Sequence, residues 1–250
     1  MIAFISDIHS NTEALSVCLD RIKQLGAERV VCLGDVIGYG PEPLATLTVV
    51  MQACEFSLLG NHEEGCMYYT PDFNPRARAA IEWTKDQLNR HQPREERLRF
   101  WKYIGEMKKS HREGRLLFVH GSPKDPVKEY IVPRDAQDRE KMTEWFAKME
   151  DAQLCFVGHS HVPGLYLESG QYLPPNAVDG RFKADGQRAI VNIGSVGQPR
   201  DGDPRASFVT FDGKEVVFHR LDYDFRATMA KIRAVPQLPE YLAERLAQGR

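Results

Sequence analysis

The stretch IAFISDIHSNTEALSVCLDRIKQLGAERVVCLGD, residues 2–35, decides the fold class. Residues 2–6 and 29–33 form short apolar runs next to polar residues, and both suit buried strands. Between these runs apolar side chains recur at helical spacing, namely Leu15, Cys18, Ile22 and Leu25. The stretch therefore predicts a strand, a helix and a second strand.

Local signals place the ends of this helix and continue the pattern to residue 59. Ser10 followed by Glu13 is a capping box that predicts the helix start, and Gly26 predicts its left-handed C-terminal cap. Pro41 is expected to open a second helix, and residues 56–59 a third strand. Strands that alternate with helices imply right-handed crossovers and neighbouring, largely parallel strands.

The remainder of the chain is expected to add helices first and strands later. Residues 75–88, 93–109 and 134–149 read as helices, and residues 116–119 as a strand. Later β-type runs lie at residues 154–157, 189–193, 207–211 and 216–221. Antiparallel strands after a parallel start predict an α/β fold with two packed sheets and helices outside.

Length and composition favour one domain. The chain has 250 residues, 42% of them hydrophobic and 27% charged, which are ordinary values for a globular protein with a sizeable core. We expect a single domain over residues 1–250, with a helical insertion around 72–112 and a short helical C-terminal tail at 224–250.

Charge does not select a polyanionic partner. The formal net charge is −2, so nothing in the overall balance indicates nucleic acid or an anionic membrane. Residues 85–115 are a local exception, with ten Lys or Arg against five Asp or Glu. Two interpretations stay open: a solvated face of surface helices, or a basic rim that attracts a phosphorylated substrate.

The cysteines and the N-terminus favour the cytoplasm. Five cysteines are scattered without metal-type spacing, and Cys32 and Cys155 lie inside apolar runs as buried thiols do. The N-terminus has no basic start or long apolar segment, and no run approaches the ~18 apolar residues of a membrane-spanning helix. We therefore expect a cytoplasmic protein in a reducing compartment.

Five polar clusters each follow directly on an apolar strand. They are Asp7-Ile8-His9, Gly34-Asp35, Gly60-Asn61-His62-Glu63, His120-Gly121 and Gly158-His159-Ser160-His161. Ligands of open α/β sheets bind beyond the carboxyl ends of the strands, so all five clusters are expected to converge on one site. Each cluster alone has an ordinary structural explanation, but one metal site accounts for all of them together.

The donor types identify the kind of metal. The clusters offer two aspartates, an asparagine and several imidazoles, and no thiolate. Imidazole with carboxylate suits Mn²⁺, Fe²⁺, Co²⁺, Ni²⁺ or Zn²⁺, whereas a structural zinc site or Cu⁺ would favour cysteine. Seven candidate donors exceed one coordination sphere, so we expect two divalent metal ions that share a bridging carboxylate.

The ordered motifs DIH, GD, GNHE, HG and GHSH, between residues 7 and 161, resemble the signature of the calcineurin-like metallophosphoesterase superfamily, on its small bacterial phosphodiesterase-like branch. The resemblance implies a four-layer α/β/β/α sandwich of two mixed sheets flanked by helices. It assigns Asp7, His9 and His161 to the first metal, Asn61, His120 and His159 to the second, and Asp35 to both. His62 matches the motif histidine that faces the substrate without binding metal.

Two further segments bear on the substrate. Phosphoprotein phosphatases of the superfamily follow Gly-Asp with an Asp-Arg-Gly triplet, but residues 34–41 here contain no arginine, which puts phosphoprotein substrates in doubt. Tyr39 either lines the substrate pocket or only packs. Residues 192–200 resemble a segment of the small bacterial members and are read as support near the site. Glu63 either supports the neighbouring metal ligands or is a solvated glutamate of a first helical turn, and the second interpretation is favoured.

Together these features predict a phosphoric ester hydrolase. A hydroxide bridging the two metals would attack phosphorus, and His62 as imidazolium would protonate the leaving oxygen. We expect small phosphorylated molecules, nucleotides among them, as substrates, with phosphodiesters cleaved at least as well as monoesters. We expect neither a membrane nor an obligate nucleic-acid partner. The alternatives are a nuclease acting on polynucleotide and a non-catalytic scaffold on the same fold.

Overall fold

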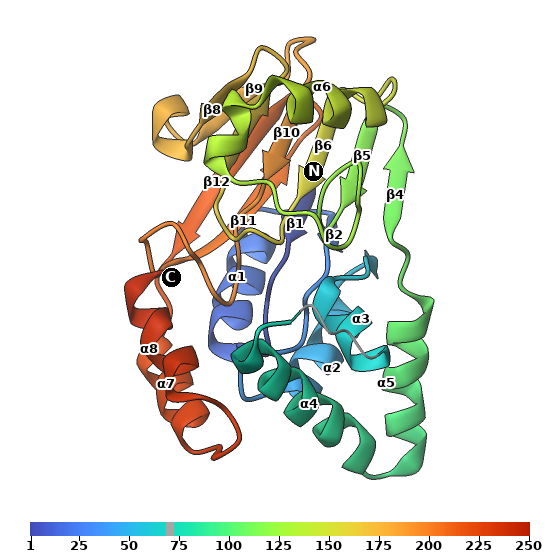
Figure 1. The fold of residues 1–250 in the computed structure, drawn as a ribbon, viewed down its shortest axis with the longest axis vertical. Coiled ribbons are helices and arrows are strands. Elements are labelled where there is room, and N and C mark those ends of the chain that lie inside the picture. Colours follow the sequence, from blue (N-terminus) through green and yellow to red (C-terminus); the bar gives the residue numbers. More distant parts are fainter. Residues whose placement is uncertain (69–72) are drawn as a thin grey trace.

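The computed structural model describes residues 1–68 and 73–250, and its core is a pair of mixed sheets with six strands each (Figure 1). The first sheet runs in the order β3-β2-β1-β11-β12-β9. Its strands are β1 (Ile2–Ile5), β2 (Arg29–Cys32), β3 (Phe56–Ser57), β9 (Arg181–Lys183), β11 (Ala206–Phe211) and β12 (Glu215–Leu221). The second sheet runs in the order β4-β5-β6-β10-β7-β8. Its strands are β4 (Ser110–Glu113), β5 (Leu116–Val119), β6 (Leu154–Val157), β7 (Gly164–Leu167), β8 (Gln171–Leu173) and β10 (Ala189–Asn192).

Strand direction confirms the parallel start and corrects the prediction for the later strands. β1, β2 and β3 pair in parallel, as the strand-helix-strand pattern predicted. β6 and β10 were expected to be antiparallel but belong to a parallel set with β5. The reason is that long connections separate β5 from β6 and β6 from β10, so each strand re-enters the sheet in the same direction. β11 and β12 return to the first sheet and pair antiparallel to β1 and to each other.

Alternation along the strands buries both faces of each sheet. Phe4 of β1 points between the sheets and stacks on Phe156 of β6 at a centroid distance of 4.1 Å. Ala3 and Ile5 point the other way and pack under the helices. Successive strand side chains face opposite sides, so a continuous apolar run such as residues 2–5 is what a doubly covered strand requires.

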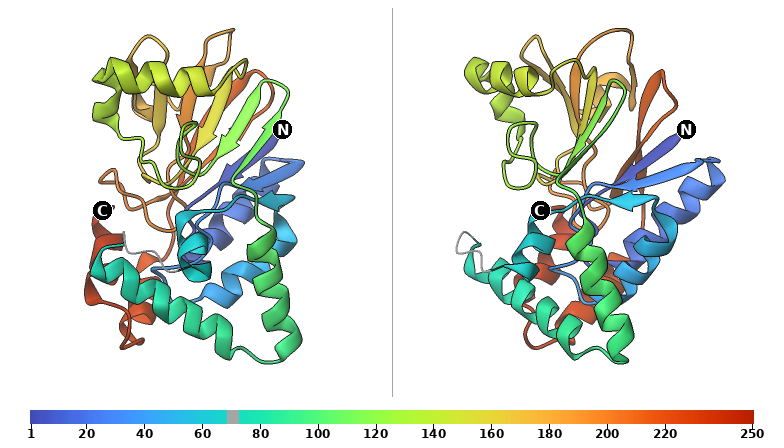
Figure 2. Two further views of the ribbon diagram at one scale, coloured as in Figure 1. Left: turned by 45° about the vertical axis from the view of Figure 1, so that its right-hand side comes forward. Right: turned by 90° about the vertical axis from the view of Figure 1, so that its right-hand side faces the viewer.

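Helices cover the outer faces and complete the four layers. α1 (Thr12–Gln24) and α2 (Pro43–Ala53) pack on the first sheet, and α6 (Arg139–Lys148) packs on the second through Trp145 and Phe146. The right-hand view of Figure 2 shows α6 on one side of the two sheets and α1 with α2 on the other. The α/β sandwich predicted from the sequence is the observed fold.

The remaining helices gather beyond the carboxyl ends of the parallel strands (Figure 1). They are α3 (Asn61–Met67), α4 (Pro75–Arg90), α5 (Arg94–Glu106), α7 (Phe225–Arg233) and α8 (Glu240–Gln248). Residues of α4, α7 and α8 share one apolar cluster with Tyr39. Of the insertion predicted around 72–112, residue 72 lies outside the described residues, α4 and α5 fill most of the rest, and the last residues belong to β4.

Several predicted boundaries shift for identifiable reasons. Asn11, and not Ser10, caps α1: its side chain accepts a hydrogen bond from the Ala14 amide, while the Ser10 amide donates to the Val36 carbonyl. The helix expected at Pro41 begins at Pro43. The helix expected over residues 134–149 starts only at Arg139. Asp138 caps it, because its side chain accepts hydrogen bonds from the amides of Glu140 and Lys141.

Within residues 1–68 and 73–250, no helix has the length and apolar character needed to cross a bilayer. The longest of the helices described there, α4, has 16 residues and carries charged side chains along its length.

Candidate metal centre

The five polar clusters converge at the carboxyl ends of the parallel strands, as the sequence predicted. Asp7 and His9 follow β1, Asp35 follows β2, His120 follows β5, and His159 with His161 follows β6. Asn61 and His62 open α3 directly after the short strand β3. All eight side chains are buried, the most exposed being Asn61 at 9%. The structure therefore brings every candidate site residue into one place.

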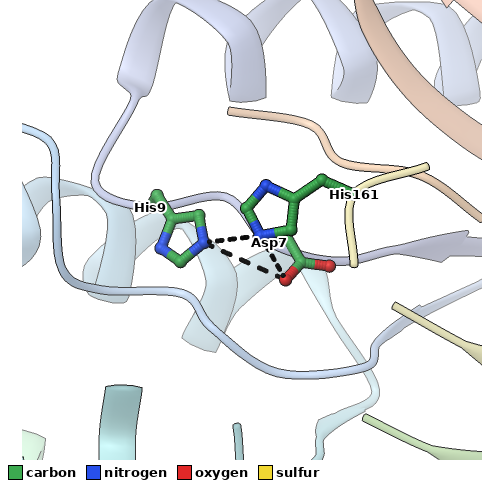
Figure 3. A group of neighbouring side chains, drawn as sticks. All are labelled: Asp7, His9 and His161. Carbon is green, nitrogen blue, oxygen red and sulfur yellow. Dashed lines mark hydrogen bonds and ion pairs between the residues drawn. The ribbon is translucent and has the colours of Figure 1, made fainter. Parts of the chain in front are cut away.

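The first group of donors consists of Asp7, His9 and His161 (Figure 3). The Nε2 atom of His161 lies 3.1 Å from Oδ1 of Asp7. The Nε2 atom of His9 lies 3.2 Å from that of His161 and 3.9 Å from the same carboxylate oxygen. Figure 3 shows both rings turning a nitrogen toward the Asp7 carboxylate. Three donor atoms thus face one another across a space of ion size.

The second group consists of Asp35, His120 and His159, with Asn61 beside them. The Nε2 atom of His120 lies 3.4 Å from Oδ2 of Asp35, 3.2 Å from Oδ1 of Asn61 and 3.1 Å from Nδ1 of His159. The same Oδ2 atom of Asp35 is also 3.7 Å from Nε2 of His9 in the first group. Asp35 is therefore the carboxylate that faces both groups.

Backbone carbonyls determine which nitrogen of each imidazole carries the proton. One nitrogen of every ring lies next to a carbonyl oxygen: His9 Nδ1 at 3.2 Å from Ile37, His120 Nδ1 at 3.1 Å from Leu33, His159 Nε2 at 3.0 Å from Lys128, and His161 Nδ1 at 2.5 Å from Gln198. A carbonyl oxygen only accepts, so that nitrogen is the N–H donor. In the neutral ring the other nitrogen then presents a lone pair to the donor groups.

These inward lone pairs meet other acceptors. Burial lowers the pKa of both His9 and His161, so both rings are neutral at pH 7. Their Nε2 lone pairs therefore face each other at 3.2 Å and face the Asp7 carboxylate. Acceptors at hydrogen-bond distance with no proton between them repel, and a cation among them removes the repulsion. The donor set thus fits a divalent metal ion.

In the second group one proton takes the place of a cation. Burial favours the neutral ring of His120, yet the Asp35 carboxylate raises the pKa of His120 to about 9. Burial opposes ionisation of Asp35, yet the His120 and His62 imidazoles hold its pKa well below its ordinary value. Burial lowers the pKa of His159 to about 3. A metal bound by His120 would displace the proton from its Nε2 atom.

The backbone is strained where the donors leave it. Five of them have left-handed φ angles, namely Asp7 at 53°, His9 at 50°, Asp35 at 52°, His159 at 63° and His161 at 60°. Such conformations cost of order 1 kcal/mol or more for residues with a Cβ and persist when the surroundings determine them. Left-handed turns at the strand ends direct several donors to one point, and this concentration of strain marks a functional site.

Glu63 is not the solvated glutamate that the sequence favoured; it has the alternative role, as a support of the metal ligands. The side chain is fully buried, and its carboxylate accepts hydrogen bonds from the amides of Asp35 at 2.9 Å, Ile37 at 3.1 Å and Gly60 at 3.1 Å. Burial and the nearby Asp35 carboxylate raise the pKa of Glu63 to about 7. The sequence placed Glu63 at a helix start but could not reveal that this helix end is covered. Glu63 ties the Asp35 loop to the Asn61 loop.

His62 lies beside the donors, and its ring forms a third possible metal-binding group with His9 and Asp35. Its ring contacts His9 and Tyr39 at centroid distances of 4.6 and 4.3 Å. The Nδ1 atom is buried and has no hydrogen-bond partner in the part of the chain that the structure describes. A Cβ atom at Gly38, whose φ is +88°, would lie 2.0 Å from this nitrogen, so only glycine fits there. Burial lowers the pKa of His62 to about 4, so the ring is neutral before a substrate binds.

A pocket of about 200 Å³ opens beside the metal donors. Its lining residues are Tyr39, Asn61, Glu64, Phe73, Asn74, Ala77, Lys128, Tyr130 and His159. Tyr130 stacks on the His159 ring at a centroid distance of 3.8 Å and remains 47% exposed. Tyr39 both packs and lines the pocket. The pocket therefore joins two metal donors to aromatic walls.

The segment at residues 192–200 supports the site, as expected. Asn192 donates to the Gly158 carbonyl, Ser195 donates to the Asp7 carbonyl, and the Gln198 carbonyl fixes the proton on His161. The sequence analysis included Arg200 in this supporting segment but did not anticipate the effect of its charge, which together with burial lowers the pKa of His62 and His161. It missed Arg245, which lies over Tyr39. No motif or spacing marked Arg245.

The basic stretch at residues 85–115 lies on the surface with several of its cations paired. Arg90 pairs with Asp86, Lys102 with Glu106, Lys109 with Glu64, and Arg112 with Glu150 and Asp151. These pairs favour the interpretation as a solvated face over that as a substrate-attracting rim.

Comparison with known proteins gives concordant results. Residues 1–215 match the family model of the calcineurin-like phosphoesterase superfamily domain. The chain is 36% identical over 257 residues to the uncharacterized protein MJ0912 of Methanocaldococcus jannaschii, covering 100% of this chain and 98% of that protein. The crystal structure of a metallophosphoesterase from Sphaerobacter thermophilus superposes with a TM-score of 0.83 at 36% identity, covering 100% of this chain and 98% of that one. The hypothetical protein PH1004 from Pyrococcus horikoshii OT3 shares the fold, with a TM-score of 0.74 at 18% identity, 100% coverage of this chain and 99% of that one.

Proposed function

Because the chain belongs to the calcineurin-like phosphoesterase superfamily and buries two adjoining groups of metal donors, we propose that it is a two-metal-dependent phosphoesterase. The proposed ligands are Asp7, His9 and His161 for one ion, Asn61, His120 and His159 for the other, and Asp35 for both. The proposed ions are Mn²⁺, Fe²⁺, Co²⁺, Ni²⁺ or Zn²⁺, which suit imidazole with carboxylate.

The observation that carries the proposal is the orientation of the four imidazoles. Each ring donates one N–H to a backbone carbonyl and turns its other nitrogen toward Asp7 or Asp35. Carbonyls in this role fix the ring and raise its basicity toward a metal. The Nε2 atoms of the neutral His9 and His161 rings lie 3.2 Å apart with their lone pairs facing each other. This arrangement is repulsive unless a cation lies between them.

The chain's own residues supply binding and proton transfer. When bound, two divalent ions would activate a water molecule and neutralise charge on the phosphoryl oxygens. Asp35, facing both donor groups, sets their separation. Glu63 fixes the two loops that carry Asp35 and Asn61. The left-handed strand ends hold the remaining donors in place before substrate arrives.

His62 is proposed to protonate the leaving oxygen. It lies next to His9 and Tyr39. Its buried Nδ1 atom has no hydrogen-bond partner among the described residues, which supports a role toward substrate. The ring is neutral in the free protein because burial lowers its pKa to about 4. The negative charge of a bound phosphate would raise this pKa, so the proton is taken up as substrate binds.

We propose small phosphorylated molecules as substrates, with phosphodiesters hydrolysed at least as well as monoesters and phosphoproteins poorly. The pocket of about 200 Å³ suits a small molecule, and the Gly34–Asp35 loop lacks the arginine of the phosphoprotein phosphatases. The paired cations in residues 85–115 do not favour a nuclease, and a scaffold would not need all seven donors. Five free cysteines, four of them buried, support a cytoplasmic location.

A phosphoester panel tests this proposal. Purified protein supplied with Mn²⁺ would be assayed on bis-p-nitrophenyl phosphate, p-nitrophenyl phosphate, a phosphoserine peptide, and single-stranded DNA and RNA at two salt concentrations. We expect the diester to be turned over at least as fast as the monoester, and the peptide poorly. Efficient peptide turnover with negligible diester activity would overturn the substrate ranking, and salt-sensitive cleavage of polynucleotide in preference to the small esters would indicate a nuclease.

A further inference from the structure

Among the described residues, two arginines close to the metal centre pair with no aspartate or glutamate side chain. Ion pairs engage many arginines of this protein, for example Arg29, Arg181 and Arg220, but within residues 1–68 and 73–250 neither Arg200 nor Arg245 forms one. Both side chains are partly buried. A guanidinium that loses water without gaining a carboxylate is poorly compensated, so two of them next to one tyrosine ring require an explanation.

Arg200 is held at the site by the same turn that orients a metal ligand. Its amide donates to the His161 carbonyl at 3.2 Å, and its guanidinium donates to the Gln198 side chain at 2.8 Å. The Gln198 carbonyl in turn accepts the proton of His161. The Nε atom of Arg200 is buried and has no partner among the described residues. One turn therefore positions a ligand and a cation with an unused hydrogen-bond donor.

Arg245 reaches the same place from the C-terminal helix α8. Its guanidinium lies 5.8 Å from the centroid of the Tyr39 ring, and that of Arg200 lies at the same distance. The Tyr39 ring also contacts the rings of His9 and His62, and it lines the pocket. Burial and the charge of Arg200 lower the pKa of Arg245 to about 10. The two cations repel each other. Arg245 also lies 5.2 Å from the centroid of the Tyr241 ring and donates to the main-chain oxygen of Arg250, the last residue of the sequence.

We propose that Arg200 and Arg245 bind a second phosphate group of the substrate, next to the phosphate that is cleaved. This inference rests on the proposed function and narrows its substrate class to molecules with two adjacent phosphates, such as nucleotides with a phosphoanhydride. A guanidinium pair suits such a group because each fork offers several N–H donors to phosphate oxygens, and one dianion offsets the repulsion between them. The cation missing from the Gly34–Asp35 loop is thus supplied from elsewhere in the chain.

Binding of two nucleotides that differ by one phosphate tests the inference without turnover. Isothermal titration calorimetry on the purified protein would compare adenosine 5′-(α,β-methylene)diphosphate, which resists hydrolysis at its bridge, with AMP. We expect the diphosphate to bind more tightly to the wild type. Arg245→Gln should weaken diphosphate binding roughly tenfold to hundredfold, the range for a lost hydrogen bond to a charged group. AMP binding should change far less.

Controls separate loss of the site from loss of the fold. Arg245→Lys keeps the charge and should restore part of the diphosphate affinity. Arg181→Gln removes an arginine paired with Glu215 in β9, at the far end of the first sheet, and should leave both affinities unchanged. Melting temperatures of all variants would be measured alongside.

The result that would overturn the inference is equal binding of the diphosphate by wild type and Arg245→Gln. If diesters are hydrolysed in that case, the proposed function stands and only the second phosphate site falls. If instead no phosphoester is hydrolysed but Arg245→Gln still weakens diphosphate binding, the anion site stands and the proposed function falls.

Discussion

Asp35 differs from the other aspartate of the site, because one of its oxygens faces both groups of donors. Oδ2 lies 3.4 Å from Nε2 of His120 and 3.7 Å from Nε2 of His9. The Asp7 carboxylate lies next to donor atoms of the first group, those of His161 and His9. Its contact with the second group is through the main-chain amide of His159, at 3.0 Å, and not through a donor atom. The two carboxylates therefore have different consequences when they are changed.

Asp35→Asn should be the most damaging ligand substitution. It removes the negative charge between two adjacent dications, whereas His9→Ala removes one ligand of one ion. We expect excess Mn²⁺ to restore much of the activity of His9→Ala and little of that of Asp35→Asn. The measurement is bis-p-nitrophenyl phosphate turnover as a function of added metal. Equal rescue of the two variants would show that Asp35 does not bridge.

His62→Ala should keep near-normal metal content and lose activity according to the leaving group. An alkoxide cannot leave unprotonated at neutral pH, whereas p-nitrophenolate needs little help. We expect a small loss on p-nitrophenyl esters and a loss of roughly 10²–10⁴ on alkyl or nucleoside esters. The comparison is kcat/KM across esters of graded leaving-group pKa. A uniform loss would mean that His62 positions phosphate, and loss of metal would mean that it is a ligand.

Glu63→Gln should weaken the site without touching a metal donor. The carboxylate accepts from three backbone amides, and a glutamine amide would turn N–H groups toward some of them. We expect the free energy of unfolding to fall by about 1–3 kcal/mol and the metal affinity by roughly 10–100-fold. Denaturant titration and metal titration would measure these changes. Glu244→Gln, on the exposed face of α8, is the control. If Glu63→Gln has the same free energy of unfolding and the same metal affinity as this control, the role of Glu63 is contradicted.

At the scale of elements, the sequence predicted the parts whose periodicity is regular. Residues 2–35 became β1, α1 and β2 nearly as predicted, because apolar spacing distinguishes strand from helix there. β4, β7, β8 and β9 were not anticipated. β4, β8 and β9 are short and partly polar, and β7 is a short apolar run that starts with a glycine. Pairing with neighbours from distant parts of the chain makes them strands, and local sequence does not record such neighbours.

One such long-range link joins the two sheets. Arg29 of β2 donates hydrogen bonds to Glu55 before β3 and to Glu113 of β4. Hydrogen bonds from Arg29 lower the pKa of Glu113 from 4.5 to about 2. Because the pKa of Glu113 is lower in the folded than in the unfolded protein, its ion pair with Arg29 stabilises the fold above pH 4.5. This stabilisation is lost as the pH falls toward 2 and Glu113 becomes protonated.

Arg29→Met should therefore destabilise the protein at pH 7 by about 1 kcal/mol, a modest value because both side chains are about one third exposed. The difference from wild type should narrow at pH 3. Denaturant unfolding at both pH values would measure it. Arg90→Met, which breaks an exposed pair within α4, should have little effect at either pH. A gap for Arg29→Met that does not depend on pH would mean that Glu113 is not its partner in solution.

At the scale of the whole molecule, the sequence predicted the donors and one supporting segment, residues 192–200, but not the other groups that support or surround the site. Asp7, His9, Asp35 and the other donors were identifiable because each follows an apolar strand, and parallel strands end at one edge. The effect of the Arg200 charge, the position of Arg245 and the buried role of Glu63 were not identifiable. They depend on how the loops and the C-terminal helices close over the strand ends, and no periodicity specifies that closure.

The central claim is that the buried donors hold two metal ions that act together in phosphoester hydrolysis. The most direct test is a titration of metal-free protein with Mn²⁺, in which bound metal per chain and bis-p-nitrophenyl phosphate turnover are measured on the same samples. We predict no activity without metal, binding that reaches two ions per chain, and activity that reaches its maximum only as the second ion binds. Full activity in a preparation shown to be metal-free, or saturation of both quantities at one ion per chain, would contradict the account.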